Sequence, residues 1–313
     1  MDINRNTALI IIGPTGIGKT EVSLEIVKHV SCEIVSADSR QVYRFMDIGT
    51  SKPSKEALRN IKHHFINILN PDQDYSAGQY AKEAREIINQ IFDRRNTPLI
   101  VGGSGLYVKA LLEGFFGEDF RDESIREQLQ NRMDENGTKH LYAELQKVDP
   151  QTAVGIHPNN TRRILRSLEV YYITGEPISQ IQNSKKDPAP FPWIKFGLTM
   201  KREKLYERIN QRVDKMFKDG LVEEVQNLLK KRYSTELNSL NSVGYKEVIN
   251  YLDNKMTLEE CIHLIKQNTR RYAKRQLTWF RKEEDINWVT IEDYENFTSQ
   301  IANSILERYN GLN

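Results

Sequence analysis

The sequence predicts an α/β protein whose parallel-sheet core is interrupted by a helical insertion. Near the start, the apolar residues Ala8–Ile12 lead into a glycine-rich turn, and a helical pattern follows. Two more buried-type strand patterns, at 32–37 and 98–101, are separated by an amphipathic helical pattern at 76–92. This alternation is typical of a parallel sheet with crossover helices. Between about Phe120 and Ile181 the pattern is helical throughout, which indicates an insertion.

Composition narrows the class of protein before any motif is considered. The length of 313 residues favours about two domains. The longest apolar run is too short to span a bilayer, and the first six residues lack a signal-peptide pattern. The only two cysteines, Cys32 and Cys261, lie far apart, which excludes a disulfide framework or a zinc-ligand spacing. We therefore expect a cytoplasmic protein with no membrane partner.

Charge is distributed unevenly along the chain. The whole chain carries a net charge of +2, but residues 201–282 contain 19 Lys and Arg against 11 Asp and Glu. That segment is therefore strongly basic, while the rest of the chain is acidic. Such asymmetry favours a polyanionic partner for the C-terminal third. A solvated, lysine-rich face with no partner is the alternative.

The turn after the first strand has the pattern G-x-x-x-x-G-K-T of a phosphate-binding P-loop. Its residues are Gly13, Pro14, Thr15, Gly16, Ile17, Gly18, Lys19 and Thr20. Glycines let the backbone approach phosphate oxygens, and the following helix directs free N–H groups and its positive dipole end at the anion. Lys19 adds a positive charge, and the Thr20 hydroxyl can hold Mg²⁺. The core is thus expected to resemble that of P-loop NTPases.

Asp38 follows the second predicted strand, Cys32–Ala37. We expect this strand to lie beside the P-loop strand, which would bring the carboxylate close to the phosphate, since ligands bind at the carboxyl ends of parallel strands. A carboxylate there can act as a general base or as a magnesium ligand through water. The alternative is a helix N-cap or a turn residue.

The predicted strand at 98–101 ends in glycines and Ser104. P-loop proteins that hydrolyse nucleotides usually place an acid there to help hold magnesium. Its absence favours a loop that binds the phosphate of a leaving group.

The insertion and the C-terminal part both present cations on helices. Three helices are expected in the insertion, at Glu123–Asn136, 139–148 and Thr161–Thr174, and a proline-rich linker at 185–192 leads to a returning strand at 191–200. Arg162, Arg163 and Arg166 at the start of the third helix suit phosphate contact or, equally, salt bridges to acidic helices.

Two helices are expected in the C-terminal part, at 204–218 and 257–282. The first carries Arg208 and Arg212 on one face. The second carries two rows of cations at helical spacing, which can follow a nucleic-acid backbone or simply face solvent. The rows are Lys266, Arg270 and Lys274, and Arg271 and Arg275.

Several motifs together resemble the bacterial-type tRNA dimethylallyltransferases, also called tRNA isopentenyltransferases, over nearly the whole chain. The most specific are the run from Asp38 to Pro53 and the segment from Lys274 to Arg281. The others are the P-loop, Gly102-Gly103-Ser104-Gly105-Leu106-Tyr107, Val148-Asp149-Pro150, Ile156-His157-Pro158-Asn159-Asn160, Arg163 with Arg166-Ser167-Leu168-Glu169-Val170, and Val243-Gly244-Tyr245.

The resemblance implies transfer of a dimethylallyl group from its diphosphate to N6 of the adenosine beside the anticodon, at position 37. It makes Asp38 the base that takes the amine proton, while Lys19, Arg212 and Mg²⁺ on Thr20 support the departing diphosphate. Ser104, where relatives usually have threonine, is expected to contact the amine or Asp38. The base must leave the stack to react.

The resemblance also implies contacts with the tRNA anticodon stem-loop. Arg40 and Gln41 would read the extruded adenine and its neighbours, and Arg126 would contact tRNA near the reacting atoms. The full expected set is Asp38, Ser39, Arg40, Gln41, Ser104, Arg126, Arg162, Arg163, Arg166, Val243, Gly244, Tyr245, Lys274, Arg275, Gln276 and Arg281. We expect a monomer with a catalytic core at 1–118 and 191–313 and a tRNA-contacting insertion at 119–190.

Three other classes of function were weighed. A small-molecule P-loop kinase would share the P-loop and Asp38, but it explains neither the missing strand acid nor the basic helix at 257–282. An enzyme that prenylates free adenine nucleotides such as AMP or ATP would share the chemistry without needing an RNA-binding surface. A protein that only binds RNA has no use for Lys19 and Thr20 in this frame.

Overall fold

A computed structural model describes residues 7–115, 120–184, 187–291 and 297–312. By its internal contacts the chain divides into two compact units. The core unit comprises residues 1–75, 83–108 and 190–313, and the helical unit comprises 76–82 and 109–189. The expected domain boundary at 118/119, the start of the linker at 185 and the N-terminal six residues lie outside the described residues.

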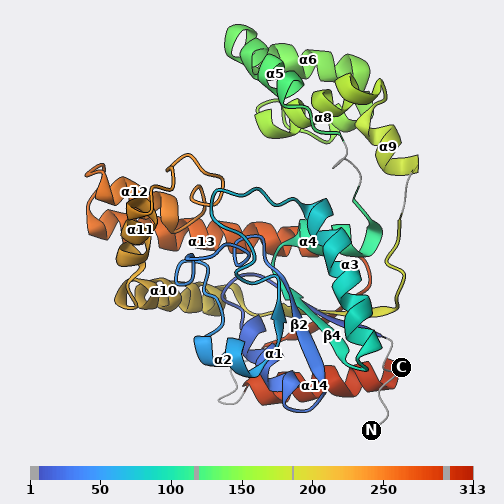
Figure 1. Ribbon diagram of the computed structural model, residues 1–313, viewed down its shortest axis with the longest axis vertical. Coiled ribbons are helices and arrows are strands. Elements are labelled where there is room, and N and C mark those ends of the chain that lie inside the picture. Colours follow the sequence, from blue (N-terminus) through green and yellow to red (C-terminus); the bar gives the residue numbers. More distant parts are fainter. Residues whose placement is uncertain (1–6, 116–119, 185–186, 292–296, 313) are drawn as a thin grey trace. The chain divides into compact units, whose positions relative to one another are not determined.

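In the described part of the core unit, six parallel strands form one sheet in the order β3-β2-β4-β1-β5-β6 (Figure 1). The strands are β1 (Ala8–Ile12), β2 (Cys32–Ala37), β3 (His63–His64), β4 (Thr97–Gly102), β5 (Trp193–Thr199) and β6 (Ile286–Thr290). Every strand therefore ends at the same edge, where the P-loop and Asp38 both follow directly. The predicted α/β fold is confirmed.

The expected position of β2 beside the P-loop strand is wrong. Strand β4 lies between them, because Ile34 of β2 pairs with Leu99 and Ile10 of β1 pairs with Ile100. The connection from β1 to β2 leaves room for one strand between them, and β4, which comes later in the chain, occupies that position. Asp38 is consequently one strand farther from the P-loop than expected, and Gly102 becomes the direct neighbour of Ile12.

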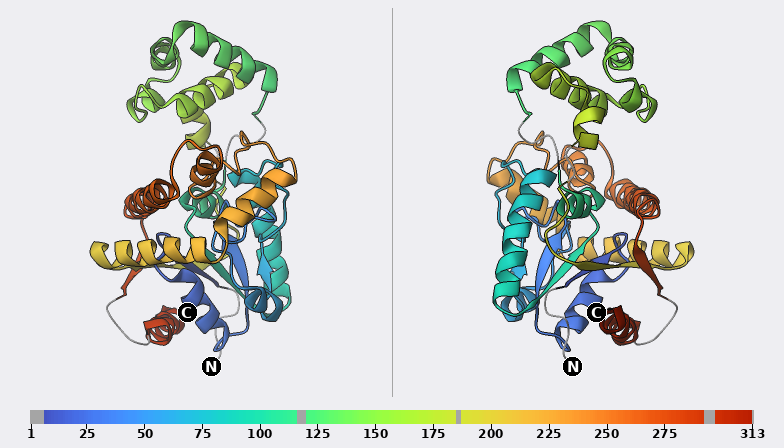
Figure 2. Two further views of the ribbon diagram at one scale, coloured as in Figure 1. Left: turned by 90° about the vertical axis from the view of Figure 1, so that its left-hand side faces the viewer. Right: turned by 90° about the vertical axis from the view of Figure 1, so that its right-hand side faces the viewer.

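Helices cover both faces of this sheet, so its central strands are buried. Helices α1 and α14 pack against each other on one face, where Val22, Ile26 and Ile305 join the buried strand residues (Figure 2). Helix α3 covers the opposite face (Figure 1). The helices with residues in this unit are α1 (Lys19–Val27), α2 (Lys55–Asn60), α3 (Ala77–Asp93), α4 (Gly105–Glu113), α10 (Arg202–Lys218), α11 (Leu221–Lys230), α12 (Tyr245–Leu252), α13 (Leu258–Phe280) and α14 (Phe297–Leu312).

The helical unit has an apolar core of its own, centred on Leu129, Leu141, Leu145, Ile164 and Leu168. Its helices are α5 (Glu123–Asn136), α6 (Thr138–Val148), α7 (Pro150–Val154), α8 (Thr161–Thr174) and α9 (Ile178–Ser184). The side chains of Asp122, Asp149 and Asn160 cap α5, α7 and α8, which satisfies backbone N–H groups that a helix start leaves free.

The predicted helices at Glu123–Asn136 and Thr161–Thr174 are confirmed. Strand β6 and helix α14 were not predicted. Among the described helices, none combines the length and the apolar character needed to cross a bilayer.

Candidate active site

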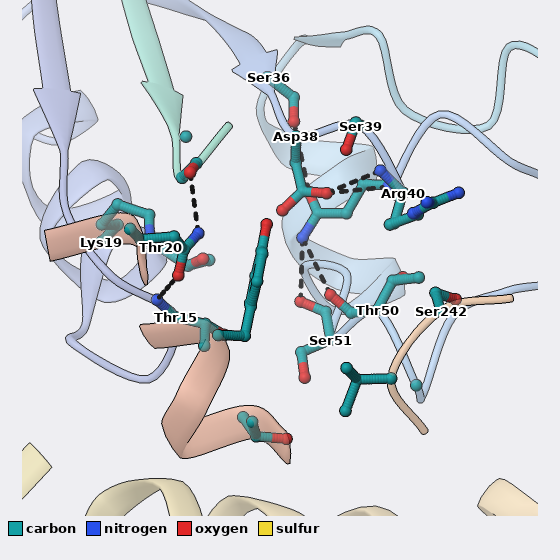
Figure 3. Close-up of a pocket in the computed structure, with 18 of the residues that line it drawn as sticks. Thr15, Lys19, Thr20, Ser36, Asp38, Ser39, Arg40, Thr50, Ser51 and Ser242 are labelled. Atoms are coloured by element: carbon teal, nitrogen blue, oxygen red, sulfur yellow. Dashed lines mark hydrogen bonds between the residues drawn. The ribbon is translucent and has the colours of Figure 1, made fainter. Parts of the chain in front are cut away.

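A cavity of about 410 Å³ lies at the carboxyl ends of β1, β2 and β4 (Figure 3). Residues far apart in the sequence line it, including Thr15, Lys19, Thr20, Asp38, Gln41, Arg212, Val243, Tyr245, Tyr272, Arg275 and Gln276. A second cavity, of about 830 Å³, shares six lining residues with the first: Lys19, Thr20, Ser51, Pro53, Arg212 and Met216. The shared residues, which include the P-loop residues Lys19 and Thr20, therefore lie between two spaces that a substrate could enter.

The P-loop has the geometry of an anion cradle. Gly16 has φ +80°, and a Cβ there would lie 2.9 Å from Ile209 Cγ1, so only glycine fits this turn. Helix α1 begins at Lys19 with Gly18 as its N-cap, and within the described chain no side chain caps it. Its first N–H groups and the positive end of its dipole are left for an anion.

The Lys19 ammonium is held at the loop itself. Its Nζ donates hydrogen bonds to the carbonyls of Gly13 and Pro14, both at 2.9 Å. Burial lowers the pKa of Lys19 to about 8; the negative charge of Asp38 opposes this shift, and the cation of Arg212 adds to it. An anion that binds beside a buried amine favours the charged form of the amine and raises its pKa.

Arg212 and Arg208 lie four residues apart on α10 but have different surroundings. Arg212 lines both cavities, and in the described chain its buried Nε has no hydrogen-bond partner. Burial lowers the pKa of Arg212, while Asp38 and Glu21 favour its charged form. Arg208 instead donates from Nε to Gly16 O at 3.1 Å, and its guanidinium lies 4.9 Å from the centroid of the Phe297 ring. Arg208 thus supports the loop, whereas Arg212 has donor capacity directed at the cavities.

The carboxylate of Asp38 makes the hydrogen bonds of a turn residue and also lines the cavity. Its Oδ1 accepts hydrogen bonds from the backbone N–H of Arg40 at 2.8 Å and of Gln41 at 3.3 Å, as a turn residue does. The other carboxylate oxygen points into the cavity, toward the side occupied by Lys19 and Thr20 (Figure 3). The turn therefore fixes the carboxylate while leaving one oxygen for chemistry.

The Ser104 hydroxyl, expected to contact the amine or Asp38, hydrogen-bonds with Ser39. Its Oγ accepts the backbone N–H of Ser39 at 3.0 Å and lies 3.3 Å from the Ser39 hydroxyl. Because β4 lies beside β2, the residue after β4 meets the turn that carries Asp38. Ser104 therefore holds that turn in place.

The side chains of Arg40 and Gln41 are tied to neighbouring loops. Arg40 donates to the carbonyl of Asn238 at 2.8 Å. Gln41 Nε2 donates to the carbonyls of Thr50 and Ser51 at 3.3 and 3.2 Å (Figure 3). The amide of Gln41 is thus engaged by the protein while its residue lines the cavity.

Gln276 was expected to contact RNA, but the structure places it inside the protein. It is 7% exposed, its Oε1 accepts the Thr15 N–H at 2.9 Å, and its Nε2 donates to Gly103 O at 2.8 Å. Both ends of the amide are used, because α13 packs across the ends of β1 and β4. Gln276 therefore connects the P-loop to the turn that carries Ser104.

Tyr245 is also internal, and its partner was missed in the sequence. The Tyr245 hydroxyl donates to Glu224 Oε1 at 2.6 Å, and burial raises the pKa of Tyr245. Glu224 also accepts the backbone N–H groups of Asp47, Ile48 and Gly49 at 2.7–3.0 Å. Glu224 thus organises the loop next to the cavity. Gly244 donates its N–H to the Glu247 carboxylate.

The cations of α13 fall into two groups. Lys266 pairs with Asp214 at 2.6 Å, and Arg270 donates to Asn210 at 2.6 Å, so both are engaged by α10. Further along α13, the exposed cations are Arg271, Lys274 and Arg275, followed by Arg281 and Lys282 just beyond its end. Tyr272, which sequence reasoning missed, lines the cavity, and burial together with the charge of Asp38 raises its pKa to about 12.

In the helical unit, Arg166 forms an internal ion pair. It donates to Glu169 at 2.7 Å and to Phe120 O at 2.7 Å. The alternative considered was a salt bridge to acidic helices, whereas the pair with Glu169 lies within α8. Arg163 donates to Gly155 O at 3.3 Å but remains exposed, as do Arg126 and Arg162.

The fold and the cavity define an α/β enzyme with a P-loop on one side of its site and a carboxylate on the other. The family model described as IPP transferase matches residues 41–283, and the chain belongs to this family. The resemblance inferred from the motifs is thereby confirmed, as is the expectation of a prenyltransferase.

Individual relatives agree with this assignment. The chain is 48% identical over 91% of its length to a tRNA dimethylallyltransferase of Pelotomaculum thermopropionicum, covering 91% of that protein. Among solved structures, it covers 98% of its length and 99% of the tRNA isopentenylpyrophosphate transferase of Bacillus halodurans, at 40% identity and a TM-score of 0.70. A eukaryotic dimethylallyltransferase acting on tRNA matches at a TM-score of 0.82 and 28% identity, over 97% of this chain and 80% of that one.

Proposed function

We propose that this protein transfers the dimethylallyl group of dimethylallyl diphosphate to N6 of adenosine 37 in tRNA. The observation that carries the proposal is the shared cavity, which Asp38 lines together with Lys19 and Arg212. One cavity thus offers a base for the adenosine amine and cations for the diphosphate leaving group.

The reaction balances with the groups in this cavity. The N6–carbon bond forms as the carbon–oxygen bond to the diphosphate breaks, and the N6 proton passes to the carboxylate of Asp38. Negative charge grows on the departing diphosphate, where P-loop N–H groups, Lys19 and Arg212 stabilise it. Fixed donors directed at developing charge are a large catalytic term.

A divalent cation, Mg²⁺, fits this site only as a partner of the diphosphate. In the described ranges no group of three His, Cys, Asp or Glu side chains could hold a metal. Thr20 and Asp38 both line the cavity, and Mg²⁺ commonly binds through one or two protein oxygens plus substrate phosphates. When bound, the ion would neutralise charge on the leaving group.

The exposed cations support tRNA as the acceptor. Arg271, Lys274 and Arg275 extend along α13, of which Arg275 also lines the cavity, and the helical unit exposes Arg126, Arg162 and Arg163. A pocket for AMP would not use these charges, whereas an RNA loop with one extruded base would. We therefore favour RNA over a free nucleotide and over a kinase substrate.

The test compares acceptors directly. The protein is incubated with dimethylallyl diphosphate and Mg²⁺ together with unmodified tRNA, AMP or ATP, and products are identified by mass spectrometry. We expect N6-dimethylallyladenosine in tRNA at a rate far above the rate with AMP. Equal rates with AMP would favour nucleotide prenylation, and ATP turnover without prenyl transfer would favour a kinase.

A further inference from the structure

One large aromatic side chain on α13 is exposed next to the cations of that helix. Trp279 is 39% exposed, although tryptophan carries a large apolar surface that folding usually covers. It lies between the exposed residues Arg275 and Lys282. The proposed chemistry uses neither its indole ring nor its position.

The indole ring of Trp279 packs against the backbone at the start of α4. A Cβ on Gly105 would lie 2.3 Å from both Cδ1 and Nε1 of Trp279, so the ring occupies the space that any side chain would need. Packing against the Gly105 backbone restricts rotation of the ring. Trp279 is therefore a supported aromatic surface and not a loose side chain.

Trp279 lies on about the same face of α13 as the residues of this helix that line the cavity. Tyr272 lines the cavity, and Trp279 is seven residues later, which returns it to about the same face about 10.5 Å farther along the axis. That offset corresponds to about three nucleotides at the stacked spacing of about 3.4 Å. The ring thus lies where a strand leaving the cavity along this face would pass.

The charge around Trp279 matches a nucleic acid. Residues 261–282 include seven Lys and Arg and no Asp or Glu. Aromatic side chains among cations are the usual platform on which single-stranded bases stack. Phe45, another exposed aromatic among the described residues of the core unit, differs because the Lys231 ammonium lies 4.8 Å from the centroid of its ring.

We infer that Trp279 is a stacking platform for a nucleobase that neighbours the extruded adenosine in the RNA. The inference rests on the proposed function and adds a contact that positions the loop outside the cavity. Stacking does not depend on charge, so the contact should add affinity without changing the number of phosphates bound. Loss of Trp279 should therefore lower RNA affinity without changing its salt dependence, whereas loss of Lys274 and Arg275 should change the salt dependence.

The test measures binding of an unmodified anticodon stem-loop RNA to the full chain at several salt concentrations. Variants are Trp279→Leu, which keeps an apolar side chain, and Trp279→Phe, which keeps an aromatic face. Leu258→Ala is the matched control, because Leu258 is 41% exposed at the other end of the same helix. Quenching of tryptophan emission by RNA is followed in the wild type and in Trp279→Phe.

We expect Trp279→Leu to weaken RNA binding about 5- to 100-fold, from the loss of one stacked base. Trp279→Phe should retain most of the affinity but lose the quenching, and Leu258→Ala should match the wild type. The salt slope should be unchanged in all of them. The inference is overturned if Trp279→Leu binds within twofold of the wild type, or if RNA leaves the wild-type emission unchanged. If the wild type binds no RNA, the proposed function itself fails.

Discussion

We expect Arg212 to contribute to catalysis without stabilising the fold. A comparison with Arg208, which supports the P-loop, tests this expectation. In Arg212→Met, the aliphatic length is kept but the guanidinium is lost. Its Nε has no protein partner in the described chain, so no internal hydrogen bond is broken there. Burial already disfavours its charge, as the lowered pKa of Arg212 shows. The variant should therefore melt at the wild-type temperature or above it.

The catalytic cost follows from the same geometry. One or two charge-assisted donors to the diphosphate are lost, and removing a preorganised donor of this kind costs about 2.7–4 kcal/mol, or about 10²- to 10³-fold in rate. Single-turnover prenyl transfer at saturating substrates measures this loss. Mass spectrometry of the RNA quantifies the product.

Arg208→Met supplies the comparison. It removes the hydrogen bond to Gly16 O and the contact with Phe297, so we expect lower thermal stability and a smaller loss of single-turnover rate. If Arg208→Met loses more rate than Arg212→Met, the assignment of Arg212 to the diphosphate is refuted.

Three further outcomes are expected. Asp38→Asn keeps an oxygen that can accept the Arg40 N–H, but it removes the base. Turnover should therefore fall roughly 10²- to 10⁴-fold while RNA affinity changes little. A near-normal single-turnover rate would contradict this expectation. Because the cation of Lys19 binds the diphosphate and its pKa is about 8, affinity of the free protein for dimethylallyl diphosphate should fall about tenfold per pH unit above pH 8. Lys19→Met should lack that decline, and equal pH profiles would exclude the effect. Replacing Lys274 and Arg275 together by Ala should flatten the slope of log RNA affinity against log salt by about 1.4. Lys266→Ala, which breaks an ion pair within the protein, should leave the slope unchanged. Equal slopes for the two variants would show that these two residues of α13 do not contact the RNA backbone.

The sequence predicts the P-loop well because its information is local. Strand, glycine turn and helix follow one another from Ala8 onward, and the positive φ of Gly16 and Gly18 is the conformation for which those glycines are needed. The position of Asp38 after β2 was also local, and it was correct. Its distance from the P-loop depended on strand order, which is set by pairing between distant segments.

The remaining site residues come from packing that periodicity does not reveal. Gln276 contacts Thr15 across 261 residues of chain, and Glu224 binds a loop that precedes it by 175 residues or more. A polar residue within a cationic helix is easily interpreted as an RNA contact. Only the packing of α13 across the strand ends shows that Gln276 faces inward.

The pairing of Arg208 and Arg212 illustrates the same limit. Four-residue spacing placed both on one side of α10, and only the family resemblance selected Arg212 for the diphosphate. The structure distinguishes them because Gly16 and Phe297 engage Arg208, which lines only the second cavity, whereas Arg212 lines both cavities.

The most direct test of the central claim is made on tRNA from cells. The gene, as wild type or Asp38→Asn, is expressed in a bacterial strain lacking its own tRNA dimethylallyltransferase, and the tRNA nucleosides are analysed by mass spectrometry. We predict that the wild type restores N6-dimethylallyladenosine at position 37 and that Asp38→Asn, present at the same protein level, restores little or none. Absence of the modified nucleoside with the wild type, or equal amounts with both, would contradict the account.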